Sequence, residues 1–107
     1  MIYVITAHLD APSRNERAID DWIRGHFESW TNPLPGTWIV EGPLAAEQID
    51  RALAPLLDAG GRLLIVKAAT EAIWHGVSAE AGRWLEGNFP GSITNRIPGE
   101  GDVLDRA

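Results

Sequence analysis

The side chains best suited to chemistry stand at the end of the first apolar segment, where His8 and Asp10 lie two positions apart. An imidazole can act as a general base near neutral pH, and a carboxylate oxygen can hold Mg²⁺ or Mn²⁺. Because strand side chains alternate between faces, the two point the same way only if the strand continues to Asp10. The alternative for His8, which we prefer, is a strand-end histidine that bonds the backbone of the following turn.

His26 and His75 are the other two histidines of the chain. His26 is expected near the end of a helix, where the helix dipole mildly favours a cation, and His75 is expected in a loop. Neither stands at metal-ligand spacing from a second ligand, so both are expected to be structural or on the surface. The chain has no cysteine, which excludes a disulfide, a thiolate metal site and a cysteine nucleophile. It also lacks a nucleophile-elbow serine and a glycine-rich phosphate loop after the first strand.

Five tryptophans are many for a chain of 107 residues. Trp22, Trp38 and Trp84 fall on faces predicted to meet the core or its edge, whereas Trp30 and Trp74 lie in less regular segments. Exposed tryptophans mark protein interfaces, and they also stack on nucleic-acid bases. Acidic surroundings favour a protein partner over a nucleic acid.

The composition predicts one small globular domain, because 45% of the 107 residues are apolar. Fifteen acidic residues against nine basic ones give a net charge of −6, which repels phosphate backbones. No apolar run approaches the roughly 20 residues that a membrane span needs, and the first residues lack the basic region of a signal peptide. We therefore expect a soluble cytoplasmic protein.

Short regular segments must position these side chains. The patterns of apolar residues and of turn residues predict seven segments. In order they are a strand at 2–9, a helix at 15–28, a weak strand at 28–33, a strand at 37–41, a helix at 45–59, a strand at 62–69 and a helix at 78–88. Pro55 is expected to kink or split the second helix because it removes a backbone donor.

This order predicts an α+β protein with the βαββαβ ferredoxin-like fold, in which both long helices cover one face of an antiparallel four-stranded sheet. We expect residues 2–8 and 63–68 to be its central neighbours, because both segments are apolar on nearly every residue and need cover on two sides. A homodimer partner or the C-terminal segment would cover the second face. The predicted domain spans residues 1–89, and residues 90–107 form a tail rich in glycine and proline.

Four stretches resemble, in the same order, the SinR-type small proteins, a label unrelated to the sporulation regulator of that name. They are Tyr3-Val-Ile-Thr-Ala-His-Leu-Asp-Ala-Pro12, Gly36-Thr-Trp-Ile-Val40, Leu63-Leu-Ile-Val-Lys67 and Ala72-Ile-Trp-His-Gly-Val-Ser78. Such proteins are related to VapD-type ribonucleases and to the small ferredoxin-like protein of CRISPR adaptation complexes. The resemblance covers residues 2–89. It implies a homodimer and, in the nuclease members, a metal-dependent phosphodiesterase.

One position departs from that family. Its functional acid closes the first strand, and the matching residue of this chain is His8. An imidazole suits softer metals than Mg²⁺, so a two-fold pair of histidines would not reproduce a magnesium site unaided.

The preferred hypothesis is a non-catalytic homodimer that acts through protein contacts and needs no cofactor. The alternative is a metal-dependent endonuclease acting on RNA or DNA, with His8 and Asp10 as catalytic residues and Asp10 as a ligand of Mg²⁺ or Mn²⁺. A small-ligand-binding dimer is a third hypothesis.

Overall fold

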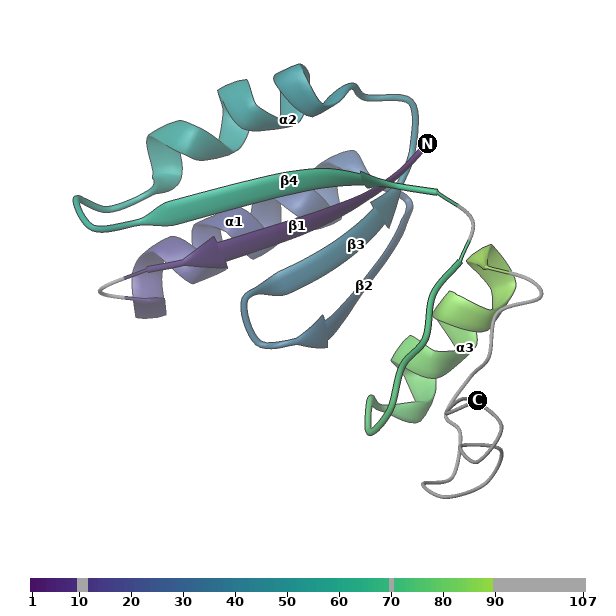
Figure 1. Ribbon diagram of the computed structural model, residues 1–107. Coiled ribbons are helices and arrows are strands. Elements are labelled where there is room, and N and C mark those ends of the chain that lie inside the picture. Colours follow the sequence, from purple (N-terminus) through teal and green to yellow (C-terminus); the bar gives the residue numbers. More distant parts are fainter. Residues whose placement is uncertain (10–11, 70, 90–107) are drawn as a thin grey trace, which may run out of the picture. The chain divides into compact units, whose positions relative to one another are not determined.

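The computed structural model describes residues 1–9, 12–69 and 71–89 (Figure 1). Asp10 and the predicted tail at 90–107 lie outside the described residues. The chain divides into two compact units, Met1–Ala69 and Thr70–Ala107.

The first unit holds one antiparallel sheet of four strands in the order β2-β3-β1-β4. The strands are β1 (Ile2–His8), β2 (Ser29–Leu34), β3 (Thr37–Glu41) and β4 (Arg62–Ala68). With helices between β1 and β2 and between β3 and β4, the chain has the predicted ferredoxin-like fold (Figure 1).

The prediction that β4 is a central strand is wrong. The strand β1 pairs with β3 on one side and with β4 on the other, which leaves β4 at an edge of the sheet. The expectation that this strand is buried is wrong as well, because Leu64 is 58% and Val66 46% exposed. An apolar sequence shows that both faces of a strand are apolar. The order of the strands depends instead on which strands the connecting segments allow to pair.

Four helical segments occur in the described residues. They are α1 (Pro12–His26), α2 (Ala46–Leu53), the short 3-10 helix η1 (Ala54–Leu56) and α3 (Ala79–Asn88). The predicted break at Pro55 is confirmed, because α2 ends at Leu53 and Pro55 falls in the first turn of η1. None of the described helices has both the length and the apolar character that crossing a membrane requires.

The core of the first unit lies between the sheet and the two helices α1 and α2. Alternate strand residues, Tyr3 and Ile5 on β1 and Trp38 and Val40 on β3, are at most 4% exposed. They share one apolar cluster with side chains from both helices, namely Ile19, Ile23, Ile49 and Leu53. Both helices therefore cover the same face, as predicted.

The turn between β2 and β3 requires a glycine. Gly36 has a φ of +77°, and its carbonyl accepts a hydrogen bond of 2.9 Å from the amide of Ala7. Pro35 before it gives the Pro-Gly order typical of a tight turn. Asn32 supports the same turn, because its side-chain amide donates to the carbonyls of Leu34 at 3.0 Å and Thr37 at 2.6 Å.

The substitution Gly36→Ala is expected to lower the free energy of unfolding by about 1–3 kcal/mol, the usual cost of a strained non-glycine backbone. A Cβ atom at this position would also lie 2.9 Å from the carbonyl oxygen of Ala7. Gly25→Ala is the matched control, because nothing lies within 4 Å of its Cβ position and the residue is in α1. Urea denaturation of both variants measures the difference, and equal stability of the two would contradict this account of the turn.

The second unit is described at residues 71–89. Ser78 caps α3, since its hydroxyl accepts a 3.1 Å hydrogen bond from the amide of Ala81. The indole nitrogen of Trp74 lies 3.6 Å from the Cβ position of Gly82, so this tryptophan packs beside α3 at ordinary van der Waals distance. Trp74 is 6% exposed, which places it in the core rather than on a binding surface.

Candidate functional site

The predicted site at the end of β1 is only partly described. His8 is exposed, and its register partner is Arg62 at the start of β4. Antiparallel partners share a face, so a histidine and an arginine stand side by side there. Asp10 lies outside the described residues, so its placement relative to His8 stays a prediction.

The structure gives the other histidines the surface or structural roles predicted for them. In His26, Nδ1 lies 2.8 Å from the carbonyl oxygen of Trp22, and the two rings stack at 4.3 Å. His75 is exposed. Among the side chains that the structure describes, no group of three or more histidines and acids is close enough to hold a metal ion.

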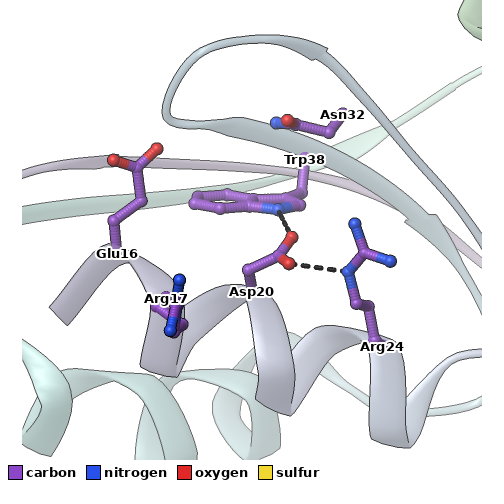
Figure 2. A pocket seen from close by; sticks show the side chains of 6 residues that line it. All are labelled: Glu16, Arg17, Asp20, Arg24, Asn32 and Trp38. Atoms are coloured by element: carbon purple, nitrogen blue, oxygen red, sulfur yellow. Dashed lines mark hydrogen bonds and ion pairs between the residues drawn. The ribbon is translucent and has the colours of Figure 1, made fainter. Parts of the chain in front are cut away.

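A polar cleft of about 300 Å³ opens between α1 and the β2–β3 hairpin (Figure 2). Its lining residues are Glu16, Arg17, Asp20 and Arg24 from α1, with Asn32 and Trp38 from the hairpin. The four helix residues follow at spacings of one, three and four, which places them on one side of α1. Two acids and two arginines balance one another in charge.

Asp20 is the centre of this cleft. Its Oδ1 accepts a 2.9 Å hydrogen bond from the indole nitrogen of Trp38, and its Oδ2 accepts a 2.6 Å bond from Nε of Arg24 (Figure 2). The guanidinium of Arg24 also lies 4.4 Å from the ring of Trp30, a cation–π distance. Asp20 therefore ties α1 to β3, and Arg24 ties it to β2.

The contacts of Asp20 suit a structural role better than a catalytic one. Both oxygens of Asp20 are already occupied by donors, so the carboxylate is poorly placed to take a proton from a substrate. The Asp20–Arg24 pair is half exposed on the arginine side and contributes only about 0.5 kcal/mol. The part-buried bond from Trp38 carries more weight, because the indole N–H of a buried tryptophan needs a partner.

Asp20 and Arg24 are not among the site residues predicted from the sequence. Two signals could have found the cleft. An acid four residues before an arginine is a favourable helix pair, and a core tryptophan requires an acceptor nearby.

The second face of the sheet carries a different surface. Val4 of β1, Ile39 of β3 and Val66 of β4 are register partners across three strands, so they share the face opposite the helices. Leu64 stands two residues before Val66 on the same face. We call these four residues the apolar second face.

The exposure of this face rises toward β4. Val4 and Ile39 are half-buried between neighbouring strands, whereas Leu64 and Val66 are 58% and 46% exposed. In the described residues no strand pairs with the outer edge of β4. The strand β4 therefore combines two exposed apolar side chains with an unpaired outer backbone, whereas the other edge strand, β2, has one such side chain, Leu34.

Fold and surface together define a ferredoxin-like α+β protein with an exposed apolar edge strand and a polar cleft. A scan against models of protein families found no match, and a search of curated proteins found none either. The resemblance to SinR-type proteins accordingly stays a prediction.

Proposed function

We propose that this chain is a non-catalytic interaction module that works as a homodimer and uses the edge of its sheet to bind. The observation that carries the proposal is the exposure of Leu64 and Val66 on an edge strand. A long, flat, apolar edge is a template for pairing with another chain, and stable monomers blunt such edges.

Two further observations support an interaction role. The polar cleft has its central acid engaged by Trp38 and Arg24, which suits a structural joint better than a proton-transfer site. The net charge of −6 disfavours a general nucleic-acid binder and leaves protein contacts as the preferred class.

The alternative, a metal-dependent endonuclease, is favoured by one observation. His8 stands opposite Arg62 in the register, so a base and a phosphate-binding cation would be neighbours at the end of β1. Under this alternative Asp10 would supply the carboxylate for Mg²⁺ or Mn²⁺.

The purified protein is expected to show about twice the monomer mass of 11.7 kDa in multi-angle light scattering at micromolar concentration. Pairing of two apolar edges is the reason, because it removes part of the surface of Leu64 and Val66 from water. A single species of monomer mass over this concentration range would contradict the homodimer.

The protein is expected to leave single-stranded RNA and duplex DNA intact with Mg²⁺ and with Mn²⁺. Strand breakage should be no faster than in a protein-free control. Cleavage at neutral pH generally needs a cation that activates water and neutralises developing charge, and His8 replaces the family acid. The time course compares the wild type with His8→Ala and Asp10→Ala. Cleavage by the wild type that either substitution abolishes would establish the nuclease and overturn the non-catalytic proposal.

A further inference from the structure

The two edges of the sheet are built differently. The strand β2 contains Pro33, and its pairing with β3 shifts register between Thr31 and Leu34. Proline and irregular pairing are devices that keep an edge from accepting another strand. One edge of this sheet is therefore protected against strand addition.

The other edge carries neither of these devices. All seven residues of β4 pair with β1 without a register shift, and none is a proline. Its charges, Arg62 and Lys67, are its first and sixth residues, which leaves residues 63–66 uncharged. A sheet with one protected edge and one unprotected edge is typical of proteins that pair with a further strand at the unprotected edge.

We infer that β4 pairs antiparallel with β4 of a second copy, with Ile65 facing Ile65 across the two-fold axis. The inference rests on the proposed homodimer and specifies its interface. Two four-stranded sheets then become one continuous sheet. The contact is isologous, because each copy offers the same strand.

The side-chain pattern selects this register. Directly opposed residues of antiparallel strands share a face, and both copies present the same face, so the two-fold axis must lie between two copies of the same residue. Ile65 is the middle residue of β4, and centring there pairs the whole strand. Leu64 of each copy then lies opposite Val66 of the other, so both exposed apolar side chains gain an apolar partner.

The charges of the strand fit the same register. Arg62 falls opposite Ala68 of the second copy, and Lys67 falls opposite Leu63. No like charges are opposed, which avoids the repulsion that destabilises cross-strand pairs. This self-complementarity favours a second copy over an unrelated extended peptide, whose side chains β4 does not specify.

Cysteine cross-linking tests the register, because the native chain has no cysteine. Opposed Cβ atoms lie about 4.5–5.5 Å apart, within reach of a disulfide, whereas diagonal neighbours lie about 7–8 Å apart. Leu64→Cys and Val66→Cys proteins are mixed in equal amounts, allowed to exchange and mildly oxidised. Only mixed dimers oppose the two cysteines, so up to about half of the dimers should become cross-linked.

The controls are each variant oxidised alone and Leu34→Cys oxidised alone and with each of them. Leu34 is 56% exposed on the opposite edge, so its cross-links report random collisions. Each variant is checked by circular dichroism. Hydrogen exchange on the wild type serves as a second measurement, in which β4 amides should exchange more slowly at high than at low protein concentration.

The outcomes separate the two proposals. Preferential linkage of Leu64→Cys to Val66→Cys, with concentration-dependent protection of β4, supports the inferred interface. A protein of dimer mass that gives only background linkage and no such protection overturns the β4 pairing and leaves the homodimer standing. A protein of monomer mass overturns both.

Discussion

Replacing Trp38 with alanine is expected to lower the free energy of unfolding by about 3–5 kcal/mol. Trp38 is 1% exposed and belongs to the core beneath both helices, so its removal leaves a cavity that the surroundings fill only in part. The substitution also removes the donor to Asp20 and with it the joint between α1 and β3. A domain of this size is stable by only about 5–15 kcal/mol, so the loss is a large share.

The measurement is urea denaturation followed by circular dichroism, because removing a tryptophan changes the fluorescence signal. Trp38→Phe retains much of the ring and loses the N–H donor, and we expect it to cost less than alanine. Leu34→Ala is the surface control, with an expected change within about 0.5 kcal/mol because the side chain is 56% exposed. Equal effects of Trp38→Ala and Leu34→Ala would show that Trp38 does not hold the core together.

Replacing Leu64 with lysine is expected to convert the proposed dimer into a monomer of 11.7 kDa. A lysine on an edge strand opposes pairing with another chain, because the pairing would draw its charge away from water and next to Val66 of the second copy. The fold should persist, since Leu64 is 58% exposed and contributes little to the core of one copy. Light scattering gives the mass and circular dichroism reports the fold.

The matched control is Leu34→Lys. Leu34 is 56% exposed, nearly as much as Leu64, and it lies on the opposite edge strand β2. The same charge added there should leave the dimer mass unchanged. If both variants lose the dimer, the added charge acts through general repulsion and β4 is not the interface.

The sequence predicted the elements of this fold better than their arrangement. The helices were predictable because apolar residues recur on one face, as Ile19 and Ile23 do in α1. The end of α2 was predictable because the ring of Pro55 removes a backbone N–H donor, which is a local effect. Strand order is different, because it depends on partners that are distant in the chain.

The strand β4 shows why the arrangement was misjudged. Apolar residues on both of its faces predict a central strand, covered by the helices on one side and by a homodimer partner or the C-terminal segment on the other. The structure gives it one strand neighbour and leaves Leu64 and Val66 exposed. Apolar character on an edge strand points to a contact between chains, and periodicity alone does not distinguish the two cases.

The candidate sites were harder to predict than the fold. The sequence does not by itself pair Asp20 with Trp38, because the bond joins α1 to β3 and the whole of β2 lies between them in the chain. The pairing of His8 with Arg62 likewise depends on the register of β1 against β4. Residue types suggested which side chains can do chemistry, and the register decided which of them meet.

The place of β1 has a consequence for synthesis on the ribosome. It is the first strand made, yet Ile2 pairs with Ala68, so the sheet stays incomplete until most of the first unit has left the exit tunnel. At about 5–20 residues per second, β1 waits several seconds for β4 after its own translation. During that interval only α1, and later β3, can cover the apolar side chains of β1. Slow codons before residue 62 would lengthen the wait and increase the demand for chaperones.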